Sequence, residues 1–540
     1  MVFARAERRT LRAAGGLALG VVLVFVGAAT AMLLAHAGDG GGAPLDAYIW
    51  RVAQFTLLQA TLSTLLSIVL AIPVARALAR QRDFRGRVWI IRLSVVPLGL
   101  PALVAALGVI EIWGRQGVVN DLLRLGGLQN PVSVYGLAGI LIAHVFFNLP
   151  LAARFLLAAL DRIPPEYWLS SANLGMGNGA VFRLIEWPVI RRVLPGVAGL
   201  VFMLCATSFT LVLTLGGGPA ATTIEVAIYQ ALRFDFDPQR AVLLAFLQIL
   251  VTATLLWLIS LFGRPPDEGV TAGRAIRRFD GRRRRVTDGL VIVLFTLFTA
   301  APLAATVTAG LAADFGRLAV DPLLHRALFT SLAISFASAC LSLAIALPVV
   351  LVPRLAETGD AGITTRLIGR ALPATGSLIL LVPPVVVATG WFLVLRSVGE
   401  TGRFAPAVIT VINALMALPF VVRVLEPAYR THLSRTARLA LSLGVTGMHR
   451  LRWIDWPALK KPFLTAFAFA MALSLGDLGA VAIFGADGFV TLPWLLFSRM
   501  ASYRTADAAG IALILGVICL LLTLPSTAAD RTTERPAADA

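Results

Sequence analysis

The sequence predicts an all-α polytopic membrane protein with about twelve transmembrane helices in two repeated halves. Of its 540 residues, 58% are hydrophobic and only 14% charged, and the mean hydropathy is +0.84, so the chain has too little polar surface for a water-soluble globule. Apolar stretches of about 20 residues, long enough to cross a hydrocarbon core, recur along the whole chain. The two halves also share matched residues at constant spacing.

The apolar stretches place six spans in residues 1–262 and six in residues 289–528. They lie near 15–36, 56–79, 89–113, 134–159, 195–215 and 240–262, and then near 289–312, 328–352, 371–395, 405–427, 463–485 and 507–528. We interpret the first as a retained signal-anchor helix, because it exceeds the usual apolar length of about 7–15 residues in a cleaved signal peptide.

A basic linker is predicted at 263–288, between the two halves, and a polar tail at 529–540. The linker contains Pro265, Pro266 and a run of four arginines at 282–285. That run has two interpretations: it sets the orientation of the chain, or it binds anionic lipid head groups.

The net charge of +18 reflects arginines gathered in alternate short loops. By the positive-inside rule, both termini and the basic loops are cytoplasmic, and no nucleic acid partner is indicated. Cys205, Cys340 and Cys519 lie far apart in apolar segments, so neither a disulfide nor a metal site is expected. The chain also shows no catalytic constellation and no cofactor motif. Its two lysines do not follow a glycine as a phosphate-binding loop requires, so ATP hydrolysis would need a partner protein.

The repeat is clearest in two blocks of the sequence. Around the second span of each half, Leu57, Ser63, Ser67, Ala71 and Pro73 match Leu332, Ser338, Ser342, Ala346 and Pro348 at one offset. Further along, Leu149, Pro150, Arg154 and Gly175 match Leu418, Pro419, Arg423 and Gly444 at another. Matched points are separated by an even number of spans, so the halves run in the same direction and are related by an axis along the bilayer normal.

One motif occurs in the long basic loop of each half, near 160–190 and 429–459. Glycine is followed after nine residues by isoleucine, any residue, tryptophan and proline, as in Gly175 with 185–188 and Gly444 with 454–457. Helix-compatible residues precede each glycine, which supplies a turn, and the proline fixes the entry to the next element. The residues that we assign to these loops are Ser170, Ser171, Ala172, Gly175, Ile185 and Pro188, and Leu439, Ala440, Gly444, Ile454 and Pro457.

The motif resembles the EAA loop of binding-protein-dependent ABC importer permeases, with tryptophan in place of the usual leucine. The glutamate usually found six residues before the glycine is replaced by Leu169 and Arg438. The resemblance implies a type I importer permease fold in which each loop docks one of two cytoplasmic ATPase copies. It also implies a periplasmic substrate-binding protein as a partner.

Local strings over about 54–509 resemble the thiamine branch of this family. They are 113–117, 144–154, 215–219 with 227–235, and 474–480. The resemblance implies import of thiamine, with or without its phosphates, across the bacterial inner membrane. The alternatives are a ferric iron permease and an ion-coupled secondary transporter.

Few ionisable residues lie within the predicted spans. Asp477 is the candidate pathway residue, because an intramembrane charge is costly and is expected to face protein or water, and Ser474 would lie one helical turn earlier on the same face. A purely structural contact is the other interpretation of Asp477. His144 and Asn148 share a helix face, which indicates either a pathway or interhelical hydrogen bonds.

Overall fold

The computed structural model describes residues 5–38, 46–127, 133–261, 282–356, 362–399, 401–445, 447–485 and 489–529. These residues form helices and contain no strand. Eleven helices are long and apolar enough to cross a membrane, or twelve if the bent pair α17 (Ile363–Leu381) and α18 (Pro384–Val398) is one span. The predicted fold class is therefore confirmed. Most of the predicted linker and nearly all of the predicted tail lie outside the described residues.

The chain forms two compact units that do not coincide with the two sequence halves. Unit 1 comprises Met1–Pro44, Ala227–Ile249 and Asp314–Ala540, and unit 2 comprises Leu45–Val226 and Leu250–Ala313. Helix α1 (Arg5–Gly38), the first of the first half, thus belongs to the unit built mainly from the second half. Helix α14 (Arg282–Leu311), the first of the second half, belongs to unit 2. Helices α12 (Ile224–Arg233) and α13 (Pro238–Leu261) each cross the division.

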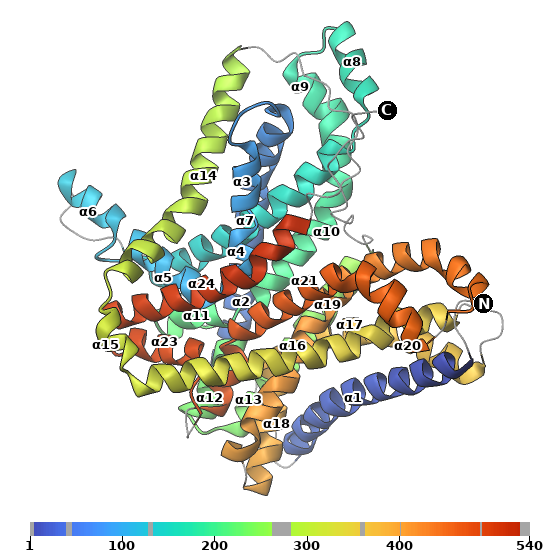
Figure 1. Cartoon of the computed structure of the whole chain (residues 1–540). Helices are drawn as coiled ribbons and strands as arrows, with labels where there is room; N and C mark the ends of the chain where they lie inside the picture. Colours follow the sequence, from blue (N-terminus) through green and yellow to red (C-terminus); the bar gives the residue numbers. More distant parts are fainter. Residues whose placement is uncertain are drawn as a thin grey trace. The chain divides into compact units, whose positions relative to one another are not determined.

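Unit 2 is built around α2, α7, α10 and α14, with α5 packed on α14 (Figure 1). Its helices are α2 (Ala47–Arg80), α3 (Arg87–Leu93), α4 (Val96–Gly99), α5 (Ala102–Trp113), α6 (Val118–Leu125), α7 (Leu137–Asp161), α8 (Pro165–Asn173), α9 (Asn178–Val181), the π-helical turn η1 (Phe182–Glu186), α10 (Trp187–Ala206), α11 (Thr210–Leu215), the 3-10 turn η2 (Pro219–Ala221) and α14. Helix α14 begins at Arg282, so the last seven residues of the predicted linker are helical.

Unit 1 is built around α16, α19 and α21, and α1 packs along α16, α17 and α18 (Figure 1). Besides α1, α17 and α18, its helices are α15 (Phe315–Ala319), α16 (Pro322–Ala356), α19 (Thr401–Ser442), α20 (Gly447–Arg450), the π-helical turn η3 (Leu451–Asp455), α21 (Trp456–Leu475), α22 (Gly479–Phe484), α23 (Leu492–Ala501) and α24 (Thr505–Ala529).

The third span of each half is interrupted, where the sequence predicted single helices at 89–113 and 371–395. In unit 2 the chain breaks into α3, α4 and α5 beside Pro97 and Pro101, and in unit 1 α17 and α18 meet at 87° beside Pro383. Proline lacks a donor N–H and disfavours helix in the residue before it, which explains both interruptions. The fifth spans, predicted at 195–215 and 463–485, are broken too, between α10 and α11 and between α21 and α22.

A hydrogen bond repeated at matched positions supports the internal repeat. The Ile224 N–H, at the start of α12, donates to the Thr56 hydroxyl of α2 at 3.0 Å. The Leu492 N–H, at the start of α23, donates to the Ser331 hydroxyl of α16 at 2.7 Å. Thr56 and Ser331 have the same offset as the first block of matched residues, so the two halves place a short helix against the second span in the same way.

In each unit, a glycine of the third span contacts the first helix of the other sequence half, which is α1 in unit 1 and α14 in unit 2. A Cβ added at Gly390 of α18 would lie 2.7 Å from the Ala29 Cα of α1. A Cβ added at Gly108 of α5 would lie 3.0 Å from the Pro302 carbonyl carbon of α14. Only glycine allows helix backbones to approach this closely.

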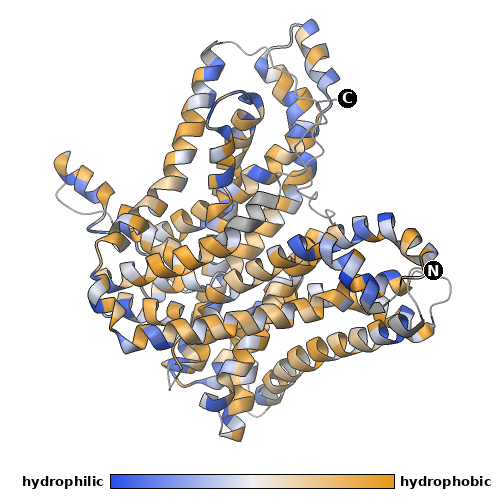
Figure 2. Ribbon diagram, viewed as in Figure 1, coloured by the Kyte–Doolittle hydropathy of each residue, from blue (hydrophilic) through white to orange (hydrophobic). Residues whose placement is uncertain are grey.

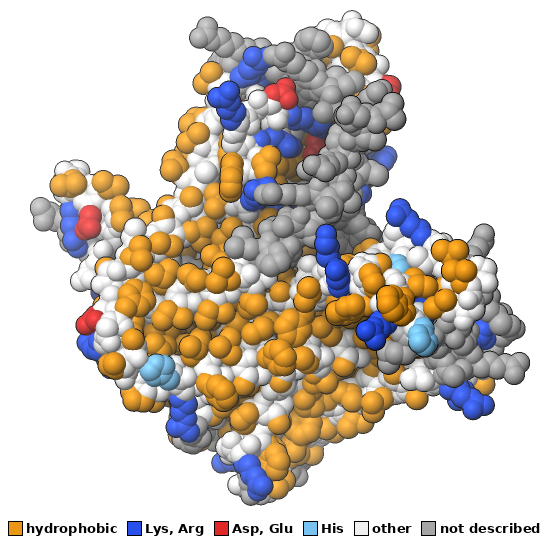
Figure 3. Space-filling model, in the orientation of Figure 1, with side chains coloured by type: hydrophobic (Ala, Val, Ile, Leu, Met, Phe, Trp, Pro, Cys, Tyr) orange, Lys and Arg blue, Asp and Glu red, His pale blue; other side chains and the backbone are white. Residues whose placement is uncertain are grey.

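The long helices are apolar along their length and polar toward their ends (Figure 2). On the face shown in Figure 3, hydrophobic side chains cover the helices and Lys and Arg side chains gather near helix ends. On α14, for example, Leu290, Val293 and Leu297 are each more than half exposed. Such surfaces require contact with lipid.

Candidate functional site: two repeated loops and a broken span

The first motif loop ends a short helix with a left-handed glycine. Helix α8 ends at Asn173, and Gly175 has a φ of 60°. The Met176 N–H donates to the Ser171 carbonyl at 2.9 Å, and the Gly175 N–H donates to the Ala172 carbonyl at 3.1 Å. This is a Schellman-type helix end, in which glycine avoids the Cβ penalty of a positive φ.

The second motif loop has the same turn but no separate short helix before it. Gly444 has a φ of 65°, and the Val445 N–H donates to the Ala440 carbonyl at 2.9 Å. The helix before this turn is α19, which runs without a break to Ser442. Pro164 and Pro165 separate α7 from α8 in the first loop, whereas the matching positions 433 and 434 are leucine and serine, so that helix continues.

Both turns bury a small residue and expose a leucine. Ser171 and Ala440 are 7% and 1% exposed, whereas Leu174 and Leu443, which immediately precede the glycines, are 75% and 64% exposed. A Cβ added at Gly175 or Gly444 would meet no atom within 4 Å. Each loop therefore presents an apolar tip with open space beside it. The remaining assigned residues share this surface or lie beside it: Ser170, Ala172 and Leu439 are exposed, as is Leu169. The side chain of Arg438 lies outside the described residues.

A single π-helical turn follows each glycine, in the same register. It is η1 in the first loop and η3 in the second, and the N–H of the following tryptophan donates to a carbonyl five residues earlier. Pro188 and Pro457 are the second residues of α10 and α21, at the entry to an element as predicted, and a π turn directly precedes each of these helices. A proline inside a helical run removes one backbone hydrogen bond and crowds the preceding turn, and the wider π turn accommodates it. Ile185 is buried within its turn, and Ile454 is half-buried.

The last residue of each π turn is an ion-paired acid. Glu186 is 1% exposed and lies 2.5 Å from Arg76 and 3.6 Å from Arg80, both of α2. Arg80 also lies 3.2 Å from Asp288 of α14, so one buried network joins the first loop to two membrane helices. Sequence reasoning missed this role, although an acid occupies the unspecified position of both motif copies.

The matching Asp455 of the second loop has different partners. Its carboxylate lies 2.7 Å from His432 of α19 and 3.4 Å from Arg450 of α20, and it is 17% exposed. The two loops thus have the same glycine turn and π turn, but their acids pair with different residues.

Asp477 lies in the break between α21 and α22 and not on a helical face. Because α21 ends at Leu475, the predicted helical alignment with Ser474 is wrong, although the Asp477 N–H donates to the Ser474 carbonyl at 3.3 Å. The Asp477 Oδ1 accepts from the Gly479 N–H at 3.1 Å, and its Oδ2 is buried with no partner among the described residues. The Ser474 hydroxyl instead accepts from Asn413 of α19 at 2.9 Å.

His144 and Asn148 make contacts with other helices, which agrees with the interpretation that they form interhelical hydrogen bonds. The His144 Nδ1 lies 3.0 Å from the Ser63 hydroxyl of α2, and the Asn148 amide lies 3.3 Å from the Cys205 sulfur of α10. Cys205 and Ser474 occupy matching positions of the repeat. Each half therefore ties the end of its fifth span, just before the break, to its fourth span.

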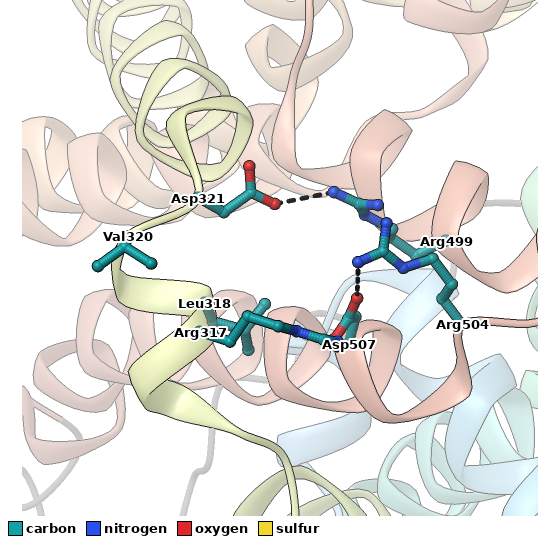
Figure 4. Close-up of a pocket in the computed structure, with 7 residues that line it drawn as sticks. All are labelled: Arg317, Leu318, Val320, Asp321, Arg499, Arg504 and Asp507. Atoms are coloured by element: carbon teal, nitrogen blue, oxygen red, sulfur yellow. Dashed lines mark hydrogen bonds and ion pairs between the residues drawn. The ribbon is translucent and has the colours of Figure 1, made fainter.

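A cavity of about 320 Å³ in unit 1 is lined mostly by charged residues (Figure 4). Arg499 lies 2.8 Å from Asp321, and Arg504 lies 2.7 Å from Asp507, which also pairs with Arg317. The first pair joins the residue before α16 to α23, and Asp507 joins the start of α24 to α15. In the part of the chain that the structure describes, no group of three or more His, Cys, Asp or Glu residues is placed to hold a metal ion.

Comparisons with known proteins identify the family. The family described as binding-protein-dependent transport system inner membrane component matches residues 67–264. The thiamine transport system permease protein of Brucella abortus (strain 2308) is 51% identical over 524 residues, which cover 96% of this chain and 95% of that protein. The chain belongs to the thiamine transport permease family.

Other members of the thiamine transport permease family match over similar lengths. The protein of Escherichia coli (strain K12) is 44% identical over 478 residues, or 88% of each chain, and that of Haemophilus influenzae is 36% identical over 526 residues, or 96% of this chain and 97% of that protein. The ferric iron alternative is not supported. Membership of the thiamine transport permease family and the apolar helices make this chain a multi-pass inner-membrane protein of an ABC transporter.

Proposed function

We propose that this chain is the membrane-spanning subunit of an ABC importer that moves thiamine from a periplasmic binding protein to the cytoplasm. The observation that carries this function is the match to thiamine transport permeases over almost the whole of both chains. Both halves and both motif loops fall within that match. The phosphate esters of thiamine belong to the same proposed substrate class.

Energy comes from two copies of a cytoplasmic ATPase, one at each motif loop. The two turns have the same left-handed glycine, the same exposed leucine and the same π turn, so two identical partner surfaces would fit them. The chain itself hydrolyses nothing and serves as the transport pathway.

In the first loop, movement of the docked ATPase is transmitted through Glu186. Its buried ion pairs with Arg76 and Arg80 connect the π turn to α2, and Arg80 continues to Asp288 of α14. In the second loop Asp455 connects the turn to α19 through His432. A shift of the first loop therefore displaces α2, because an ion pair out of water resists separation. A shift of the second loop reaches α19 through the contact between Asp455 and His432.

Asp477 is the proposed contact for the cationic substrate along the pathway, with Ser474 beside it. Its Oδ2 is buried and has no partner among the described residues, in an unwound segment of the kind that forms substrate sites in other transporters. A carboxylate there would offset the charge of a cation during its passage.

Growth and uptake test the substrate. A thiamine auxotroph that lacks this chain should need far more external thiamine than its parent, with an unchanged response to iron limitation. If thiamine demand were unaltered, the assignment would be wrong.

Reconstitution tests the energy source. Liposomes that contain the chain, its co-purified ATPase and the binding protein should take up labelled thiamine only with internal ATP. Uptake by the purified chain alone under an ion gradient would instead establish a secondary transporter.

A further inference from the structure

Unit 2 contains an apolar groove that has Arg285, an arginine without an ion pair among the described residues, at one end. The groove has a volume of about 420 Å³ and lies between α14 on one side and α3 with the segment before it on the other. Phe84 and Ile90 line one side, and Ile292 and Val293 of α14 line the other. Arg285, in the first turn of α14, stands at its end.

Four arginines near the groove pair with two buried or half-buried acids. Arg80 and Arg284 both pair with Asp288, and Arg82 and Arg87 both pair with Asp161. Arg285 is exposed and makes no ion pair or hydrogen bond with any residue that the structure describes. Asp288 and Asp161 are therefore already paired, and no described acid pairs with Arg285, although the exposed Asp83 lies next to Phe84 in the chain.

The groove lies at the level where the membrane interface is expected. Trp89 of α3 is 72% exposed, with the Arg92 guanidinium 5.0 Å from its ring. Exposed tryptophan next to arginine is typical of the head-group layer. Past Arg285, the outer face of α14 is apolar and exposed at Leu290 and Leu297, as expected for helix in contact with acyl chains.

Gly289 keeps the groove open. It lies one helical turn after Arg285 and lines the groove, and a Cβ added there would meet no atom within 4 Å. A larger side chain at this position would therefore enter the groove without disturbing the helix packing.

We propose that this groove binds one anionic phospholipid, with its phosphate at Arg285 and an acyl chain along α14. Charge selects the head group, because an unpaired arginine near the interface attracts an anionic lipid over a zwitterionic one. The apolar walls at Phe84, Ile292 and Val293 select a lipid over a free phosphate, since only a lipid buries them.

The binding can be measured on the purified full-length chain in detergent. The rise in unfolding temperature is recorded as phosphatidylglycerol or phosphatidylcholine is added, because a ligand that binds only the folded state raises it. Phosphatidylglycerol should stabilise the wild type more than phosphatidylcholine, and excess inorganic phosphate should not displace it.

Two variants separate the head group from the acyl chain. Arg285→Gln should weaken phosphatidylglycerol binding about fivefold, the contribution of one arginine near an anionic surface, and leave phosphatidylcholine unchanged. Gly289→Leu should weaken both lipids. Arg12→Gln removes an exposed arginine of α1 that does not line this groove, and it should match the wild type. Wild-type lipid selectivity in Arg285→Gln, wild-type affinity in Gly289→Leu, or displacement by free phosphate would overturn the site.

Discussion

Two carboxylates at matching positions of the repeat stand in different surroundings. Glu186 is almost fully buried and pairs with two arginines of α2, whereas Asp455 is partly exposed and pairs with His432 and Arg450. Breaking a buried ion pair leaves an uncompensated charge out of water, which costs far more than losing an exposed pair. The same chemical change should therefore have unequal effects in the two loops.

Glu186→Gln should lower the free energy of unfolding by about 3 kcal/mol, because Arg76 loses its carboxylate and Arg80 keeps only Asp288. Asp455→Asn is the matched change and should cost less, about 2 kcal/mol, because Asp455 itself keeps some contact with water although His432 and Arg450 are buried. Denaturant unfolding in detergent measures both. Adding Arg76→Gln to Glu186→Gln should recover part of the loss, and equal losses in the two single variants would contradict the buried network.

The loop glycines allow backbone strain to be separated from partner contact. Asparagine tolerates a positive φ and finds open space at Gly175 and Gly444, so Gly175→Asn and Gly444→Asn should unfold like the wild type. We expect both to reduce thiamine-stimulated ATP hydrolysis severalfold in the assembled transporter, because the new side chain lies where the ATPase docks.

Gly399→Asn is the control for this pair. Gly399 has a φ of 77° and equally open space, but it ends α18 outside both loops. Transporter that carries Gly399→Asn should therefore hydrolyse ATP like the wild type. Normal coupling in both loop variants would remove the docking role.

At the scale of elements, each unit is completed by the first helix of the other half. Helix α1 lies against α18 at Gly390, and the Trp391 indole stacks on Phe25 with ring centroids 4.7 Å apart and donates to the Phe25 carbonyl at 3.0 Å. Helix α14 lies against α5 at Gly108 in the same manner. Close glycine contact, one partly buried hydrogen bond and the ring stacking therefore hold α1 in place.

Gly390→Leu should displace α1 and lower the free energy of unfolding by about 2 kcal/mol or more, since the new side chain would overlap the backbone at Ala29. Tryptophan fluorescence should also change as Trp391 loses its stacking partner. Gly27→Leu places the same side chain on α1 itself, where a Cβ meets no atom within 4 Å, and should be neutral. A neutral Gly390→Leu would mean that α1 does not depend on this contact.

Hydropathy predicts the number and the approximate positions of the transmembrane helices, because a stretch of about 20 apolar residues is stable mainly as a helix across the bilayer. It does not predict partners, since the lipid-facing and protein-facing sides of α1 are equally apolar. The prolines at 101 and 383 were visible in the sequence, but the size of a bend depends on the packing around it. The left-handed glycines were predictable from the repeated turn. The π turns and the pairing of Glu186 with α2 depend on backbone register and on contacts about a hundred residues away in the chain.

At the scale of the whole molecule, the arginine distribution predicts that both motif loops are cytoplasmic and that the charged cavity of unit 1 is periplasmic. Leu174 and Val320 are well suited to test this, because they are 75% and 74% exposed and Val320 lines that cavity.

In a background without Cys205, Cys340 and Cys519, Val320→Cys should react with a membrane-impermeant thiol reagent added to intact cells. Leu174→Cys should react only after the cells are permeabilised. The reverse pattern would invert the orientation, with both termini outside.

The exchange of first helices also sets the order in which the molecule can be assembled during its synthesis. Helix α1 ends at Gly38, but α16, against which it packs, begins only at Pro322, about 280 residues later. At about 5–20 residues per second, α1 waits in the bilayer for roughly 15–60 s before its neighbours emerge from the ribosome. Unit 2 is complete once α14 has been inserted, whereas unit 1 cannot close until the C-terminal half has been made. The early helix must therefore be stable in lipid, or held by an insertion factor, for most of the time that the chain takes to be translated.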